Sequence, residues 1–152
     1  MLLVSACLAG FNTRYDGGNS LDERVQKLVL SGGAVPVCPE QLGGLPTPRP
    51  AVEFAGGDGA DALDGKTKVR EAETAGEKAD YTEALIRGAR ETLRIARLYR
   101  IEGAILKDGS PSCGVSCVHS GGTGQKRAGR GITAELLSRE GFRVMGVDSL
   151  QG

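Results

Sequence analysis

Short apolar runs alternate along this chain with stretches of helical periodicity, and this alternation constrains the fold more than any other feature. Four runs have the length and composition of buried strands, and the longer segments between them repeat apolar residues at spacings of three and four. The expected strands are residues 2–6, 34–37, 103–106 and 142–147. Because strands that alternate with helices form parallel sheets covered by helices, we expect an α/β fold with a small, mostly parallel, Rossmann-like sheet flanked by helices.

The helical segments carry start and stop signals. Ser20 stands three residues before Glu23, the spacing of a capping box, so we expect a helix with Ser20 as N-cap and Leu21 buried. A longer helix is expected after Asp80 as N-cap, and a last one over residues 132–140. The buried face of the long helix is expected to comprise Tyr81, Leu85, Ala89, Leu93 and Ala96.

The length of 152 residues is that of one domain, and we expect a single domain over residues 1–152. Within it, residues 41–75 interrupt the alternation with several prolines and many glycines. Residues 52–54 and 68–71 are candidate strands of this Pro/Gly-rich excursion. We interpret the excursion as a candidate cover over the rest of the domain.

The 19 basic and 19 acidic side chains cancel, so no long-range attraction of nucleic acid or of an anionic membrane is predicted. A small, weakly charged ligand fits this balance better than a polynucleotide does.

Residues 4–7 resemble the cleavage box of a lipoprotein signal, but no lysine or arginine precedes them, and a short strand is the better interpretation. Without a transmembrane run, we expect a cytoplasmic protein with reduced thiols; no feature indicates an oligomeric state.

Three cysteines stand at equivalent places in the expected topology. Cys7, Cys38 and Cys113 each come at or soon after the end of an expected strand. Ligands of open parallel sheets bind outside the carboxyl ends of the strands, so these three side chains are expected to meet. One free cysteine alone is more often a small buried hydrophobe. Three at equivalent positions favour the binding of a metal or of an iron–sulfur cluster.

The cysteine spacing bears on which metal is bound. Structural zinc needs four ligands in close pairs, and the only close pair here is Cys113-x₃-Cys117. Isolated thiolates better suit a cluster in which each sulfur binds a different iron, leaving one iron open for a substrate. The alternative is that Cys117 or His119 supplies a fourth ligand, which would make a closed zinc site, an electron carrier or a sensor. Residues 116–131 are expected to form a flexible glycine-rich loop, which favours the first interpretation.

Polar side chains accompany the cysteines. Glu40 stands two residues after Cys38 and is the natural acid/base candidate. Ser110 and Ser112 place two hydroxyl groups and several backbone N–H groups beside Cys113, where such donors orient thiolates.

Four further candidates surround the same expected site. Asp16 is either a second acid/base group or the former of an Asx turn, and Arg14 and Tyr15 precede it. Lys107 ends an expected strand and is expected to point to the same side, unless it is a surface lysine with a snorkelling stem.

With these residues in place, the chain resembles the bacterial domain-of-unknown-function family 523, whose studied members are thiouracil desulfidases. The matching stretches are Ser5-Ala6-Cys7-Leu8, Arg14-Tyr15-Asp16-Gly17, Pro36-Val37-Cys38-Pro39-Glu40 with Gly43-Gly44-Leu45, Pro48-Arg49-Pro50-Ala51, Lys107 with residues 110–114, and Gly131-Ile132-Thr133-Ala134. They cover nearly the whole chain.

The resemblance implies a [4Fe–4S] cluster on Cys7, Cys38 and Cys113 with the fourth iron free. It also implies a hydrolytic, non-redox reaction in which thiouracil or a related thiolated pyrimidine gives the oxo form and hydrogen sulfide. Glu40 is then the expected base, with Ser112 or Ser110 positioning water or the ring.

Overall fold

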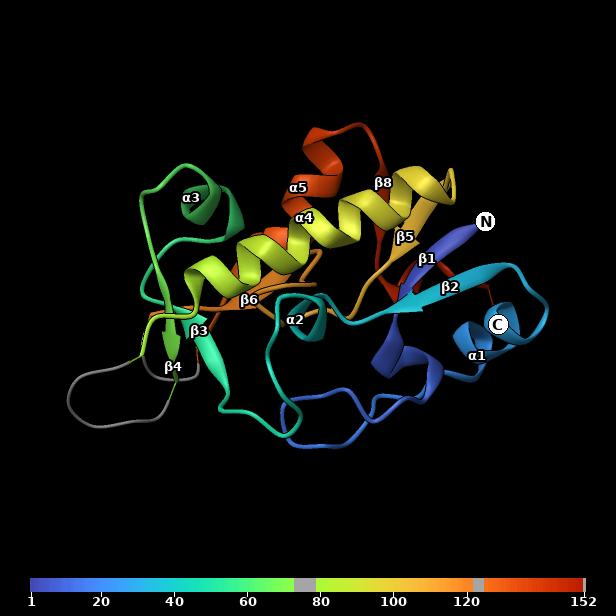
Figure 1. Ribbon diagram of the computed structural model, residues 1–152, viewed down its shortest axis with the longest axis horizontal. Helices are drawn as coiled ribbons and strands as arrows, with labels where there is room; N and C mark the ends of the chain where they lie inside the picture. The colour runs from blue at the N-terminus through green and yellow to red at the C-terminus, as the bar shows by residue number, and fades with distance from the viewer. Residues whose placement is uncertain (73–78, 122–124, 152) are drawn as a thin grey trace.

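A parallel sheet forms the centre of the molecule (Figure 1). The computed structural model describes residues 1–72, 79–121 and 125–151. The four strands of this sheet are β1 (Leu2–Ser5), β2 (Ala34–Val37), β5 (Gly103–Ile105) and β8 (Arg143–Met145). They lie in the order β2-β1-β5-β8, and every neighbouring pair is parallel. The expected α/β fold and its four strands are therefore confirmed, with each strand starting or ending within a few residues of its predicted bounds.

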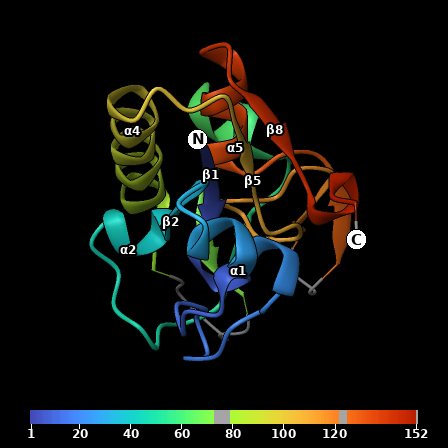
Figure 2. The same cartoon turned by 90° about the vertical axis from the view of Figure 1, so that its right-hand side faces the viewer.

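Helices cover both faces of the sheet. They are α1 (Glu23–Leu30), α4 (Thr82–Leu98) and α5 (Ile132–Arg139). Figure 2 shows α1 on one side of the strands and α4 and α5 on the other. The alternation of side chains along β1 explains this arrangement, because successive residues of a strand point to opposite faces. Leu3 packs in the cluster that holds Leu93 of α4, whereas Val4 packs in the cluster that holds Val25 of α1.

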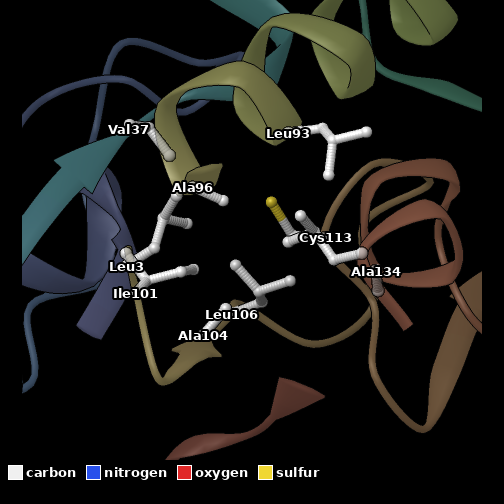
Figure 3. Packing of buried hydrophobic residues seen from close by; sticks show 10 residues of the cluster. Leu3, Val37, Leu93, Ala96, Ile101, Ala104, Leu106, Cys113 and Ala134 are labelled. Carbon is white, nitrogen blue, oxygen red and sulfur yellow. The ribbon is translucent and has the colours of Figure 1, made fainter. Parts of the chain in front are cut away.

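The larger core cluster lies between the sheet and the α4–α5 layer. Figure 3 shows it, with Cys113 among Leu93, Leu106 and Ala134. Cys113 is 6% exposed. Within the described ranges, no helix combines the length and the apolarity that crossing a membrane requires.

Two predicted helix starts need correction. The N-cap of α1 is Asp22, whose carboxylate accepts a 2.9 Å hydrogen bond from the backbone N–H of Arg24. Ser20 is therefore not the cap; its hydroxyl accepts a 2.8 Å bond from the Arg14 guanidinium instead. Because the helix starts later than predicted, Leu21 lies outside it and is 48% exposed.

The second correction is smaller. Helix α4 begins at Thr82 with Tyr81 as N-cap, one residue later than predicted. Asp80 still serves this helix end, because its carboxylate accepts a 2.9 Å bond from the backbone N–H of Thr82.

The Pro/Gly-rich excursion is more ordered than its sequence indicates, although its residues 73–75 lie outside the described residues. Helix α2 (Pro39–Leu42) leads into it, and it contains β3 (Val52–Phe54), α3 (Gly59–Leu63) and β4 (Val69–Glu71). The two candidate strands are confirmed as an antiparallel pair. Phe54 and Val69 are fully buried in a second cluster with Leu85 of α4 and Ile132 of α5. The excursion is thus packed against two helices of the main domain.

Residues 116–131 were expected to form a flexible loop, and this expectation is wrong for the described part of the segment. Strands β6 (Cys117–His119) and β7 (Lys126–Ala128) pair antiparallel there, while residues 122–124 lie outside the described residues. Val118 is fully buried in the same cluster as Phe54, which fixes β6 against the excursion.

Candidate active site

A cavity of about 500 Å³ opens beyond the carboxyl ends of β1, β2 and β5. Cys7, Cys38 and Cys113 all line it, so the structure brings together the three cysteines that the topology predicted to meet. Cys7 lies in the 3₁₀ turn Ala6–Ala9, which follows β1. Cys38 directly follows β2, and Cys113 lies in the loop after β5. Figure 1 shows β3 and β4 on the side toward which β1 and β2 point. Arg49, Val52 and Glu53 of the excursion are among the residues that line the cavity.

The electrostatics of the thiols show that the three groups are neighbours. Burial, and then the charges that Cys7 and Cys38 carry when ionised, hold the pKa of the Cys113 thiol well above its usual range. Burial and the charge of Cys38 raise the pKa of Cys7, while the cations of Lys107 and Arg14 act in the opposite direction. The pKa of Cys113 thus responds to both other thiols and that of Cys7 to Cys38, while the positive charges of Lys107 and Arg14 favour the Cys7 thiolate.

The donors at the cavity are three cysteine sulfurs. Within the part of the chain that the structure describes, no group of three or more His, Cys, Asp or Glu side chains is arranged to hold a single metal ion. Three sulfur donors are compatible with a cluster, in which each thiolate binds a different iron.

Glu40 lies at the start of α2 and is buried between two partners. Its Oε1 atom forms a 2.8 Å ion pair with Nε of Arg49, and its Oε2 atom accepts a 2.9 Å hydrogen bond from the Ser112 hydroxyl. Arg49 is itself 5% exposed at its side chain and donates from Nη2 to the carbonyl oxygen of Thr13 at 2.9 Å. The carboxylate is therefore held in one orientation at the wall of the cavity.

Close backbone contact fixes α2, and with it Glu40 and Cys38. A Cβ atom on Gly88 of α4 would lie 1.9 Å from the carbonyl oxygen of Pro39, and one on Gly43 would lie 2.1 Å from that of Ala84. Only glycine permits this approach of two helices.

The loop that carries Cys113 is held by α5 and by Ser110. The first backbone N–H groups of α5 donate to the carbonyl oxygens of Pro111 at 2.7 Å and of Ser112 at 2.9 Å. The Ser110 hydroxyl accepts from the backbone N–H groups of Ser112 at 3.0 Å and of Cys113 at 3.2 Å. The two serines thus have different tasks: Ser110 shapes the loop, whereas the Ser112 hydroxyl binds Glu40.

With this geometry established, comparison with known proteins identifies the family. The family model for 2-thiouracil desulfurase matches residues 2–149. The chain belongs to the 2-thiouracil desulfurase family. This confirms the resemblance seen in the sequence motifs.

Two relatives support membership of the 2-thiouracil desulfurase family. The uncharacterized protein YbbK of Bacillus subtilis (strain 168) is 43% identical over 151 residues, which are 99% of this chain and 97% of YbbK. A solved structure, the [4Fe–4S]-dependent thiouracil desulfidase TudS (DUF523Vcz), is similar with a TM-score of 0.81 and 37% identity. That similarity covers 98% of this chain and 91% of TudS.

The remaining predicted residues of this member of the 2-thiouracil desulfurase family separate into two groups. Arg14, Tyr15 and Lys107 line the cavity, and the Arg14 guanidinium lies over the Tyr15 ring at 5.7 Å from its centroid. Asp16 is not among the described residues that line this cavity. Its carboxylate accepts a 2.9 Å bond from the backbone N–H of Gly18, which favours the Asx-turn alternative.

The two candidates for a fourth ligand also differ. His119 lines the cavity, and its Nδ1 atom lies 2.8 Å from the carbonyl oxygen of Gly109. Cys117 is not among the described residues that line the cavity. The structure therefore leaves His119 as the stronger candidate for a closed site.

Sequence reasoning missed Asp108 as part of the site. Burial opposes its ionisation, but hydrogen bonds from the Ser116 hydroxyl and from the backbone N–H groups of Ser116, Cys117 and Val115 outweigh this, so the pKa of Asp108 lies well below its usual range. Asp108 thereby fixes the turn between β5 and β6. A lone aspartate among glycines and serines gave no signal for this role.

Arg49 and Glu53 were missed as well, and both line the cavity. Arg49 stands between two prolines in a segment of unclear structure, where its buried ion pair with Glu40 was not visible in the sequence. Glu53 is 2% exposed, and its Oε2 atom has no hydrogen-bond partner among the described residues.

Proposed function

We propose that this protein is a [4Fe–4S]-dependent, non-redox desulfidase that hydrolyses thiouracil or a related thiolated nucleobase to the oxo form and hydrogen sulfide. The observation that carries the proposal is the meeting of three thiols and the Glu40–Ser112 pair at one cavity. Membership of the 2-thiouracil desulfurase family and the similarity to TudS support it.

Cys7, Cys38 and Cys113 would hold the cluster through three irons, leaving one iron without a protein ligand. When bound, the cluster would supply a thiophilic Lewis acid for the sulfur of the substrate. Lys107 and Arg14 line the same cavity, and their positive charges favour the ionised form of the Cys7 thiol, which such binding requires.

Glu40 is the proposed general base. Its carboxylate takes a proton from water as the water oxygen attacks the ring carbon of the C–S bond, and the departing sulfur leaves as hydrogen sulfide. The balance is one water consumed for one sulfide released, with no electron transferred. Arg49 holds Oε1 at 2.8 Å and so keeps the carboxylate aligned, while Oε2 faces the hydroxyl of Ser112.

Ser112 is the proposed positioning group for water. Its side chain is 1% exposed, and its hydroxyl donates to Glu40 at 2.9 Å. The oxygen of a hydroxyl group retains acceptor capacity when its proton is donated, so a water molecule can donate to Ser112 while it approaches Glu40. Burial of the pair excludes bulk solvent from this contact.

One observation favours a second candidate function, a non-catalytic metal or cluster protein in which the site is closed. His119 lines the cavity with its Nδ1 atom engaged by Gly109, which leaves Nε2 as a ligand atom. A fourth protein ligand would occupy the coordination position that a substrate needs.

Anaerobic reconstitution with iron and sulfide separates the two functions. The reconstituted protein is incubated with 2-thiouracil, and uracil and sulfide are measured against cluster-free protein as the matched control. The desulfidase predicts equal amounts of both products from the loaded protein alone. Stoichiometric zinc in the protein, with no cluster and no sulfide release, would contradict it and support the closed site.

A further inference from the structure

Glu53 and Thr133 are the two buried polar side chains of the described residues that carry an atom without a hydrogen-bond partner there, and Glu53 is the one that ionises. It is 2% exposed, it lines the cavity, and its Oε2 atom has no hydrogen-bond partner there. Buried carboxylates are paired as a rule, and leaving one unpaired is costly. An acceptor of this kind at the wall of a cavity points to a donor on the ligand.

The strand that carries Glu53 explains why its side chain reaches the cavity. Neighbouring residues of a strand point to opposite sides. Phe54, the next residue of β3, is fully buried in the hydrophobic cluster that it forms with Leu85 and Ile132. Glu53 therefore points to the other side. Its cross-strand neighbour there is Arg70, which is exposed, and the described residues contain no ion pair between the two.

The two carboxylates that line the cavity differ in how their oxygens are hydrogen-bonded. Both oxygens of Glu40 are engaged, by Arg49 and by Ser112, whereas Oε2 of Glu53 has no hydrogen-bond partner among the described residues. A carboxylate is an acceptor only, and a hydrogen bond to its charged form is stronger than one to a neutral acceptor. Glu53 is therefore suited to recognise a donor, while Glu40 is suited to act on a water molecule.

We propose that Glu53 determines substrate specificity by accepting a hydrogen bond from a ring N–H group beside the carbon–sulfur bond. The substrate class is then a cyclic thioamide or thiourea with a free ring N–H, of which thiouracil is an example. This inference rests on the proposed desulfidase function and extends it to the group that selects the ring. A site built around such a bond rejects analogues that lack the donor.

The test compares 2-thiouracil with its two N-methyl derivatives, each of which lacks one N–H donor. The reconstituted wild-type protein should show kcat/KM at least about 100-fold lower for one N-methyl derivative than for the parent. Glu53→Ala removes the acceptor and opens space for the methyl group. It should raise KM for 2-thiouracil at least about 10-fold and change kcat much less. The ratio of kcat/KM between 2-thiouracil and the N-methyl derivative should fall to about threefold or less.

Glu53→Gln keeps the shape and one acceptor oxygen but loses the charge, so its KM should lie between those of the wild type and Glu53→Ala. Glu91→Ala, on the exposed face of α4 (40% exposed), is the matched control and should leave both KM and preference unchanged. A second readout uses cluster-free protein: its affinity for uracil, measured by calorimetry, should fall at least about 10-fold in Glu53→Ala.

The outcomes distinguish the inference from the function on which it rests. Wild-type turnover of thiouracil combined with unchanged KM, unchanged preference and unchanged uracil affinity in Glu53→Ala would overturn the role of Glu53 alone. Absence of turnover by a fully loaded wild-type protein would overturn the desulfidase function and the inference with it. A variant that fails to fold is recognised by circular dichroism, and Glu53→Gln then decides the question.

Discussion

The Ser112 hydroxyl donates a 2.9 Å hydrogen bond to Oε2 of Glu40, although the two residues are 72 positions apart in sequence. This bond joins the helix that follows β2 to the loop that follows β5. Both segments also carry a cysteine of the cavity, Cys38 and Cys113. The Glu40–Ser112 pair and the thiols are therefore placed by the same two crossovers of the parallel sheet.

Replacing Glu40 by glutamine should separate binding from catalysis. The amide retains an acceptor for Arg49 and nearly the same shape, so the protein should fold and take up iron and sulfide as the wild type does. The base is lost, and kcat for 2-thiouracil should fall by about 100-fold or more with little change in KM. Steady-state kinetics on reconstituted protein check this, and an unchanged kcat would assign the base elsewhere.

The Arg49–Glu40 ion pair should be important for stability, because both side chains are buried. Arg49→Met leaves the carboxylate of Glu40 without its cation, and the free energy of unfolding should fall by about 3 kcal/mol. The matched control is Arg94→Met, since the Arg94–Glu91 pair is exposed. Urea denaturation of the cluster-free proteins should show a lower midpoint for the first variant only; equal midpoints would contradict the importance of the buried pair.

Gly88 should tolerate no side chain. An alanine Cβ at this position would lie 1.9 Å from the carbonyl oxygen of Pro39, so α2 must move away from α4. We expect Gly88→Ala to lower the free energy of unfolding by about 1–3 kcal/mol and to reduce turnover, because α2 carries Glu40. Gly56→Ala is the control, since a Cβ there meets nothing within 4 Å. Thermal unfolding and turnover of both variants, measured in parallel, check the contrast; similar losses in both would contradict it.

The buried thiols predict a pH dependence of cluster loading. Burial, followed by the charges of neighbouring thiolates, raises the pKa of Cys7 and Cys113, so both stay protonated at neutral pH in cluster-free protein. Loading of the cluster must displace these protons and should become more favourable as the pH rises from 7 to 9.

Reaction with iodoacetamide at pH 7.5, followed by peptide mass spectrometry, should find Cys113 alkylated far more slowly in folded than in denatured protein. Equal rates in folded and denatured protein would show that the thiol is neither buried nor shifted.

The sequence predicted what depends on local pattern and on topology. Apolar runs indicate the four central strands, and the rule that ligands bind at the carboxyl ends of parallel strands predicts that Cys7, Cys38 and Cys113 meet, as they do at the cavity. The polar hairpin of β6 and β7 was missed because its three-residue strands have no clear periodicity. It is stabilised instead by a tertiary contact, the burial of Val118 beside Phe54.

The site residues that the sequence did not predict also depend on tertiary contacts. Glu53 and Arg49 belong to the Pro/Gly-rich excursion, whose packing against α4 is not indicated by any local sequence pattern. The helix cap was misplaced because Ser20 and Asp22 are both good capping residues. In the structure Asp22 caps the helix, and the Ser20 hydroxyl accepts a hydrogen bond from Arg14 instead.

We propose that three cysteines hold an iron–sulfur cluster and leave one iron for the substrate. The most direct test measures iron, sulfide and turnover of 2-thiouracil in anaerobically reconstituted Cys113→Ser and Cys117→Ser variants beside the wild type. We predict about four irons per chain and full turnover for the wild type and for Cys117→Ser, and loss of both for Cys113→Ser. Loss of the cluster and of turnover in Cys117→Ser, with Cys113→Ser unaffected, would contradict the claim.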